Sequence, residues 1–250
     1  MYIDTHCHII PSEYDNLDEV IKKLDGNIAI VSGDSNSTNK EVIDMISKYP
    51  NLYGTIGIHP NEIDSDIDDS INYIEANLSN TKIVGIGEIG LDYHYGKEDA
   101  NLQKEVFIKQ LELARKYNMP VTIHSRDAAL DTYEIIKNYS DLKITYHCYS
   151  YSVEMADILL KQNIKFGIGG VLTFKNSKTI KEVVEKLPLE NILLETDSPY
   201  LAPEPFRGYK NMPSNVVYVA KKIAEIKNMS YEDVINTTTY NAKKQFDLSI

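Results

Sequence analysis

The sequence predicts an α/β protein built as one (β/α)8 TIM barrel with extra C-terminal helices. Three observations support this prediction. Eight short apolar segments alternate with longer amphipathic ones, the 250 residues suit a barrel of this kind, and no Gly-rich phosphate-binding loop follows the first strand. A doubly wound open sheet is the alternative fold. Since no Pro-, Gly- or Ser-rich linker interrupts the chain, residues 1–250 are expected to form a single domain.

The eight apolar segments are the predicted strands. They are Tyr2–His8, Ile28–Ser32, Leu52–Ile58, Ile83–Glu88, Val121–His124, Ile144–His147, Lys165–Ile168 and Ile192–Thr196. The segments between them read as helices, for instance Asn101–Tyr117, where Leu102, Val106, Leu113 and Tyr117 recur at helical spacing. The tail from Ser214 to Phe246 predicts two more helices, divided near Asn228–Ser230, on the outside of the barrel.

Composition excludes several classes of protein. The chain has 42% hydrophobic and 25% charged residues, as in ordinary globular proteins, and no apolar run approaches the roughly 18 residues that cross a bilayer. A first strand that begins at residue 2 leaves no room for a signal peptide, and Cys7 and Cys148 suggest no disulfide framework, so a cytoplasmic protein is expected. The net charge of −11 argues against a broad basic face that tracks along duplex DNA.

Histidines gather where the predicted strands end. His6 and His8 stand two positions apart in IDTHCHI, so an extended strand points them, together with Asp4, to one face, with Ile3, Thr5 and Cys7 on the other. The other groups at strand ends are His59, Glu88, His124, His147 and Asp197, and only His94 among the histidines lies further along a loop. In a (β/α)8 barrel these ends form the rim that carries active sites. The set therefore predicts a metal centre.

This set contains more ligands than one catalytic ion requires. Four imidazoles and two carboxylates suit two ions that share a bridging carboxylate, and nitrogen and oxygen ligands admit zinc, manganese, iron, cobalt or magnesium. Two divalent ions, balanced by two carboxylates and a hydroxide, leave about +1 in an acidic protein, which attracts an anionic substrate. Such a pair can generate hydroxide near neutral pH and stabilise a phosphoryl transfer.

The motifs DTHCH, GIHP, GEIGLDY, IHSRDA, HCYS and ETDSPYLAP, in this order, resemble those of the TatD family of metal-dependent deoxyribonucleases within the amidohydrolase-like barrels. The resemblance runs from Asp4 to about Asn215. It implies a two-metal site that hydrolyses DNA phosphodiesters, often from the 3′ end. Because a recessed rim with little surrounding positive charge suits a chain terminus better than a duplex, single strands or frayed ends are the expected substrate.

The resemblance also assigns roles to residues. His6, His8 and Asp197 would hold one ion, His124 and His147 the other, and Glu88 would bridge them. Asp197 would also orient or deprotonate the attacking water. His59 is similar to a histidine on the phosphate side of the family site, although a rim histidine bonded to a backbone carbonyl is the alternative.

Other residues have less certain roles. Arg126 and Arg207 are candidate phosphate contacts or structural arginines, and Asp92 and Asp4 are candidate partners that orient the imidazoles. Cys7 is expected to pack toward the helices. The chain departs from the family pattern at Tyr151, Phe206 and Met212, which are expected near the substrate entrance. Six tyrosines in rim loops offer surfaces on which unpaired bases could stack, but the abundance of tyrosine, 18 residues, is the favoured explanation for them. They are Tyr93, Tyr95, Tyr149, Tyr151, Tyr200 and Tyr209.

Three functions are weighed. The leading one is a two-metal deoxyribonuclease, with no protein partner inferable from the sequence. The second is a related hydrolase of a small phosphoester, a lactone or an aminoacyl ester. The third is a metal-binding adaptor in a quality-control complex, against which the complete ligand set argues.

Overall fold

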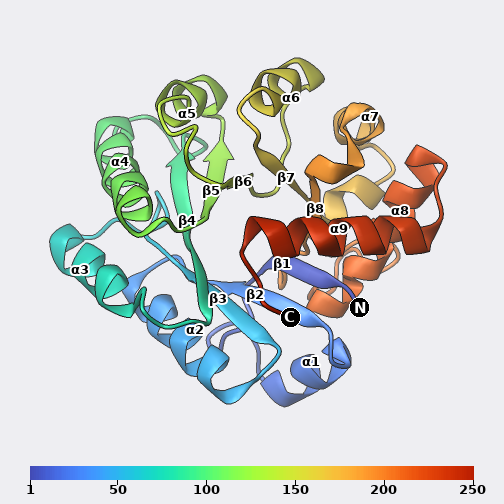
Figure 1. The fold of residues 1–250 in the computed structure, drawn as a ribbon, viewed down its shortest axis with the longest axis horizontal. Helices are drawn as coiled ribbons and strands as arrows, with labels where there is room; N and C mark the ends of the chain where they lie inside the picture. Colours follow the sequence, from blue (N-terminus) through green and yellow to red (C-terminus); the bar gives the residue numbers. More distant parts are fainter.

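Eight parallel strands form a nearly closed barrel in the computed structural model, which describes residues 1–250 (Figure 1). Neighbours in the sheet follow chain order, and the ring closes where Cys7 pairs with Ser198. The (β/α)8 prediction is confirmed and the open sheet is wrong. The strands are β1 Ile3–Cys7, β2 Ile28–Ser32, β3 Leu52–Ile56, β4 Ile83–Asp92, β5 Val121–Arg126, β6 Ile144–Tyr146, β7 Lys165–Ile168 and β8 Ile192–Leu194.

Helices surround the strands in Figure 1. The α-helices are α1 Leu17–Leu24, α2 Asn36–Lys48, α3 Ile67–Asn77, α4 Ala100–Tyr117, α5 Ala129–Ile136, α6 Val153–Leu160, α7 Lys178–Lys186, α8 Val216–Lys227 and α9 Tyr231–Gln245. Three short 3-10 segments are η1 Gly170–Thr173, η2 Leu189–Asn191 and η3 Pro213–Asn215. None of the helices combines the length and apolar composition needed to cross a membrane.

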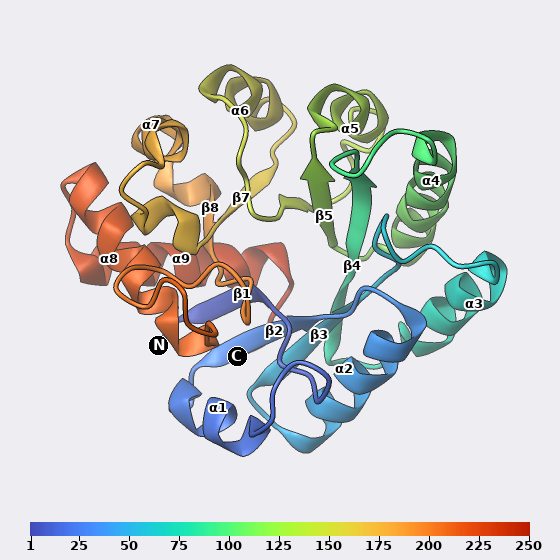
Figure 2. The ribbon, with the colours of Figure 1, turned by 180° about the vertical axis from the view of Figure 1, so that it is seen from behind.

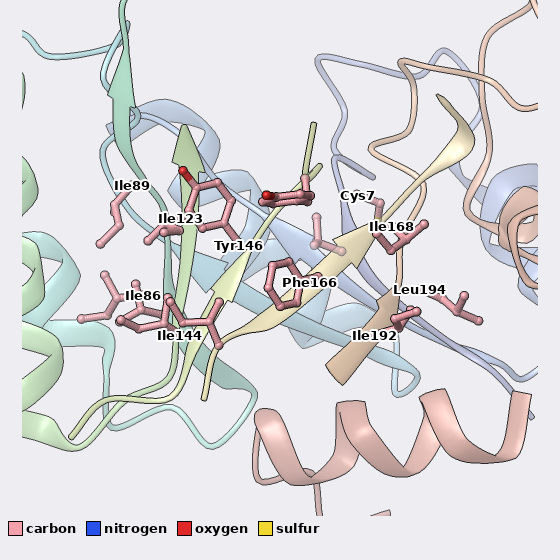
Figure 3. Packing of buried hydrophobic residues seen from close by; sticks show 14 of the residues in the cluster. Cys7, Ile86, Ile89, Ile123, Ile144, Tyr146, Phe166, Ile168, Ile192 and Leu194 are labelled. Carbon is pink, nitrogen blue, oxygen red and sulfur yellow. The ribbon is translucent and has the colours of Figure 1, made fainter. Parts of the chain in front are cut away.

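The main apolar core lies between the strands and the helices. Figure 3 shows part of this layer, with Ile123 on β5, Tyr146 on β6 and Phe166 on β7. Cys7 belongs to the same layer and its thiol contacts the carbonyl of Ile30, so the expected packing role of Cys7 is confirmed. Outward apolar residues thus leave the alternate, inward positions at the carboxyl ends of the strands for polar side chains.

A second, smaller core fills the amino end of the barrel. It combines residues of β1, β2, β4 and β8 with Phe246 and Leu248, which follow α9. Asn241 on α9 donates to the carbonyls of Leu189 and Ile192 at the start of β8. The two predicted C-terminal helices exist, but the expectation that both cover the outside is wrong, because α9 closes the amino mouth of the barrel (Figure 1).

The first strand departs from simple alternation. Its register relative to β2 shifts between Asp4 and Cys7. Ile3 therefore joins the smaller core inside the barrel, whereas Cys7 joins the main core between strands and helices. Asp4 accepts hydrogen bonds from the backbone N–H of Thr196 and from its hydroxyl, at 2.9 and 2.5 Å, rather than lining a face with His6. The predicted grouping of these side chains is therefore wrong, because a bulge adds a residue to the strand.

Strand ends differ from the predicted ones by a few residues. β4 continues beyond Glu88 to Asp92, and β5 continues beyond His124 to Arg126, because these two strands stay paired to the end. β1, β3, β6 and β8 end earlier than predicted. The segments that follow β1 and β8 lie on the side of the barrel away from α9 (Figure 2).

Helix α4 anchors the rim through two buried amides. The predicted helix exists, but Leu102 and Tyr117 are exposed and the buried face includes Gln103 and Gln110. Gln103 bonds both backbone groups of Asp92, and Gln110 bonds those of Ile58. The ends of β3 and β4 are thereby fixed where they carry polar side chains.

Candidate metal centre

Six predicted ligands converge at the carboxyl end of the barrel. They come from five different strands or the residues just beyond them: His6, His8, Glu88, His124, His147 and Asp197. Asp197 Oδ1 lies 3.5 Å from His8 Nε2 and 3.7 Å from Nε2 of both His6 and His147. Together with His59, five of these six side chains, all but the deeper His6, line a central cavity of about 240 Å³.

Glu88 stands between two groups of imidazoles. Its Oε2 lies 3.4 Å from His6 Nε2 and 4.0 Å from His8 Nε2. Its Oε1 lies 2.8 Å from His124 Nδ1 and 3.7 Å from His147 Nε2. Each carboxylate oxygen therefore faces a different pair of ring nitrogens.

Three rings are oriented by acceptors on their far sides. His8 Nδ1 lies 3.0 Å from the carbonyl of Ser32, His124 Nε2 lies 3.1 Å from Asp92 Oδ2, and His147 Nδ1 lies 3.1 Å from Glu195 Oε1. A carbonyl or a carboxylate only accepts, so the remote nitrogens of His8 and His124 carry a proton. His147 Nδ1 faces Glu195 closely but is not aligned for a hydrogen bond, and the carboxylate beside it favours the same tautomer. In the neutral ring the nitrogen that faces Glu88 then has a free lone pair, the form that ligates a metal.

His6 lies deepest, and one of its ring nitrogens faces the centre without a hydrogen-bond partner. Its Nδ1 bonds the hydroxyl of Ser32 at 3.0 Å, and this hydroxyl also bonds Thr55. Its Nε2 is buried and makes no hydrogen bond. A buried, unpartnered imidazole nitrogen beside carboxylates fits a divalent ion, and the donor set of nitrogen and oxygen suits zinc, manganese or their neighbours.

His59 differs from the other five. Its Nδ1 accepts the backbone N–H of Asn61, so the neutral ring carries its proton on Nε2, which lies 3.8 Å from Glu88 Oε1. Burial lowers the pKa of His59 to about 4 against the attraction of Glu88. His59 therefore presents an N–H donor to the centre. The alternative of a bond to a backbone carbonyl is wrong, since its partner is a backbone N–H.

Charge–charge attraction outweighs burial for most of the cluster. Burial would lower the pKa of His8, His124 and His147, but neighbouring carboxylates raise them to about 9, 9 and 10. Burial would raise the pKa of Glu88, yet the imidazoles of His147 and His6 hold it well below its usual value. Before metal binding the centre is thus a network of ion pairs.

Asp92 and Asp4 have different roles. Asp92 meets the expectation of an imidazole partner: it holds His124 and also accepts from Asn61. Asp4 is not such a partner, because its bonds to Thr196 attach the segment after β8 to β1. Asp197 directly follows Thr196 and has a backbone φ of +54°, a left-handed conformation that aspartate tolerates. The backbone N–H of Asp197 donates to the carbonyl of His6.

Sequence reasoning missed Ser32 and Glu195. Glu195 is fully buried, accepts the N–H of Cys148 at 2.7 Å, and occupies the space that a side chain at Gly167 would fill. A glutamate two residues before Asp197 on an otherwise apolar strand was the signal for Glu195. Cys148 lies near His147 and Asp197. Burial, together with the carboxylates of Asp197 and Glu195, raises the pKa of its thiol well above the usual value.

The two candidate arginines lie at different places. Arg126 lines a cavity of about 400 Å³ that also contains His124, His147 and Asp197, and its guanidinium lies 5.9 Å from the ring of Tyr95. Arg207 is not among the residues lining these cavities; it packs 4.4 Å from the ring of Phe174.

The other rim residues separate by burial. Tyr93 and Tyr149 are buried and bond Asp131 and the carbonyl of Ser152, whereas three tyrosines remain exposed: Tyr95, Tyr200 and Tyr209. The positions that depart from the family pattern do not themselves line the two cavities at the centre, although Tyr151 contacts a residue that lines one of them. Tyr151 bonds Ser125, Phe206 packs on Tyr218, and Met212 contacts Lys23. The expectation that these three lie at the substrate entrance is not met by the linings of these cavities.

Known proteins are similar to this chain in sequence and in fold. The family model described as TatD related DNase matches residues 3–247. An uncharacterized metal-dependent hydrolase of Bacillus subtilis, YabD, is 40% identical over 255 residues and covers all of both chains. One of Methanocaldococcus jannaschii is 38% identical over 251 residues, which is 98% of this chain and 96% of that protein. The crystal structure of YJJV, a TatD homologue of Escherichia coli, has a TM-score of 0.92 at 26% identity and covers 99% of this chain and 98% of that one. The chain therefore belongs to the TatD-related DNase family and is a metal-dependent hydrolase.

Proposed function

We propose that this protein is a two-metal deoxyribonuclease that cleaves DNA phosphodiesters, with a preference for single strands or frayed ends and for attack from the 3′ end. The observation that carries the proposal is the position of Glu88, whose two oxygens face separate pairs of imidazole nitrogens. A carboxylate between two such groups is typical of a ligand that bridges paired ions. The description of the family supports DNA as the substrate.

The proposed ligands divide into two groups. His6, His8 and Asp197 would hold one ion, His124 and His147 would hold the other, and Glu88 would belong to both. Divalent ions such as zinc, magnesium or manganese supply positive charge to phosphate oxygens and acidify water. The fit rests on the lone pairs directed to the centre and on the unpartnered Nε2 of His6.

Asp197 is the proposed group that accepts a proton from the attacking water. Burial would raise its pKa, but the adjacent imidazoles of His8, His147 and His6 keep the pKa below the usual value. Its carboxylate is therefore ionised near neutral pH and can accept the proton of a water that attacks phosphorus.

His59 and Arg126 are the proposed phosphate contacts nearest the reaction. The Nε2–H of His59 points to the centre and can donate to a non-bridging oxygen. Arg126 lines the adjoining cavity, where a guanidinium can bind phosphate in a bidentate way. We propose the cytoplasm as the compartment, since both cysteines are free.

The test uses end-labelled single- and double-stranded DNA with protein that has been stripped and reloaded with one divalent metal at a time. We expect metal-dependent shortening from one end, faster on single strands. We also expect about two metal equivalents per chain, and loss of both cleavage and bound metal in Glu88→Gln.

His94→Gln is the matched control, because His94 pairs with the exposed Asp127 outside the centre. It should retain metal and activity. Absence of cleavage with every metal would exclude the nuclease; turnover of small esters or phosphoesters would then favour a related hydrolase, and stoichiometric metal without turnover a binding protein.

A further inference from the structure

The cavities at and beside the metal centre differ in the charge of their linings. The central cavity also contains Asp34 and Glu62, and a neighbouring cavity of about 320 Å³, here called the acidic cavity, contains Asp92, Glu98 and Asp99. No lysine or arginine lines either of them. These two cavities repel phosphates that lie beyond the reach of bound metal.

Two further cavities combine single cations with apolar side chains. Arg126 stands at the border of the acidic cavity, since its guanidinium lies 5.9 Å from the ring of Tyr95, which lines that cavity. The cavity that contains Arg126, here called the arginine cavity, also includes Val171 and Leu201. A further cavity of about 180 Å³, here called the lysine cavity, includes Lys178 and Ile180. Asp197, a proposed metal ligand, is the only carboxylate in the two linings.

These two cavities form one path that starts at the centre. The arginine cavity shares His124, His147 and Asp197 with the central cavity. It shares Cys148, Ser150 and Val171 with the lysine cavity. A chain that leaves the centre in this direction meets apolar surface and two cations, Arg126 and Lys178, the combination that suits the bases and phosphates of a single strand.

Arg207 stands beside the outer part of this path. Its guanidinium packs on Phe174, in the turn that also supplies Asn176 and Ser177 to the lysine cavity. Lys181 fixes the same turn by donating to the carbonyl of Phe174 at 2.6 Å. Arg207 is thus too remote to line the central cavity but is placed to meet a longer substrate.

We propose that a single-stranded DNA substrate extends from the metal centre through the arginine and lysine cavities toward the start of α7, with Arg126, Lys178 and Arg207 contacting its phosphates. This inference rests on the proposed nuclease function. It predicts that the acidic cavity does not hold the polynucleotide, although that cavity also borders the centre.

The test compares Lys178→Gln with two controls. Lys186→Gln removes an exposed lysine from the other end of α7, and Glu98→Gln removes a carboxylate from the acidic cavity. For a single-stranded 12-mer at low salt, Lys178→Gln should raise KM about three- to tenfold with little change in kcat. The effect should shrink as the oligonucleotide is shortened. Both controls should stay within about twofold of the wild type.

Binding supplies a second readout. Fluorescence anisotropy with a labelled phosphorothioate 12-mer, without added divalent ions, should show weaker binding in Lys178→Gln and unchanged binding in Lys186→Gln. If the wild type cleaves DNA but Lys178→Gln behaves like its controls, the path is wrong and the nuclease function stands. If the wild type cleaves no DNA, the nuclease function is wrong. In that case weaker binding of the 12-mer by Lys178→Gln than by Lys186→Gln would leave the path as a DNA-binding surface. Equal binding by the two variants would overturn the path as well.

Discussion

Partners on the far side of each imidazole decide what the ring presents to the centre. His8, His124 and His147 each meet an acceptor there, so their inner nitrogens offer lone pairs. His59 meets an N–H donor, so its inner nitrogen offers a proton. The proposed ligand histidines and the proposed donor His59 thus differ in the atoms on the outer side of each ring.

Glu195 is expected to set the metal affinity through His147. In Glu195→Gln the shape of the side chain is kept but the charge that faces His147 Nδ1 is lost, so metal affinity should fall about 10- to 100-fold. Gly167→Ala should act similarly, because a Cβ there would lie 2.0 Å from Glu195 Oε2. Competition with a chelator measures the affinity. Glu190→Gln, an exposed neighbour, is the control, and equal affinities in all variants would contradict the role.

The raised pKa values of the histidines predict opposite pH effects on stability and metal binding. The pKa values of His8, His124 and His147 rise from 6.5 to about 9, 9 and 10. Between the unfolded and the folded pKa of each histidine, the folded metal-free protein therefore binds more protons than the unfolded chain. Their stabilisation is complete below pH 6.5 and is lost as pH rises through 9 to 10. We therefore expect the Tm of the metal-free protein to fall across this window.

Metal binding should strengthen over the same window, because the inner nitrogens must lose their protons first. At pH 7.5, loading should release about two to three protons per chain into a weakly buffered indicator solution. A Tm that rises between pH 6.5 and 9.5 without metal, or loading without proton release, would contradict this assignment.

At the scale of elements, each end of the barrel has its own closure. Asp4, Thr196 and the N–H of Asp197 tie the segment after β8 to β1 at the catalytic end. Helix α9 and Phe246 close the amino end. The amino end of the barrel, opposite the polar centre, is therefore filled by an apolar layer, here called the floor.

Phe246→Ala tests that floor. Phe246 is 2% exposed and packs in the inner core, so its truncation should cost about 3–5 kcal/mol of unfolding free energy, measured by urea denaturation. Tyr240→Ala on the exposed side of α9 should change stability by no more than about 0.5 kcal/mol. The metal affinity of folded Phe246→Ala should equal that of the wild type, whereas a parallel loss would show that the floor also shapes the centre.

Periodicity predicted the strands and the α4 helix because apolar residues recur at the spacing of each element, although Leu102 and Tyr117 of the predicted helical pattern are exposed. It did not predict the bulge in β1 or the position of α9, because these depend on contacts between residues almost 200 positions apart, such as Asp4 with Thr196. The predicted ligands lie together because strand ends meet at one rim. Ser32 was missed because a serine on a strand carries no pattern until the ring that it contacts is known. Glu195 had a signal, a glutamate next to an apolar strand, but the signal did not identify His147 as its partner.

At the scale of the whole molecule, a net charge of −11 confines nucleic-acid binding to a few cations. If Arg126, Lys178 and Arg207 are the phosphate contacts, about three counterions leave the single strand on binding. The logarithm of the binding constant should then fall with the logarithm of salt concentration at a slope of about −2. Fluorescence anisotropy titrations at constant pH, over about 50 to 300 mM KCl, measure this slope.

Lys178→Gln should make that slope shallower by about 0.7, and Lys186→Gln should leave it unchanged. A slope steeper than about −4 would require more phosphate contacts than the arginine and lysine cavities offer, and would point to a wider basic surface. Duplex DNA should bind more weakly than the single strand at every salt concentration, because its second strand brings phosphates toward Glu62 and Glu98, where no cation lines the cavities.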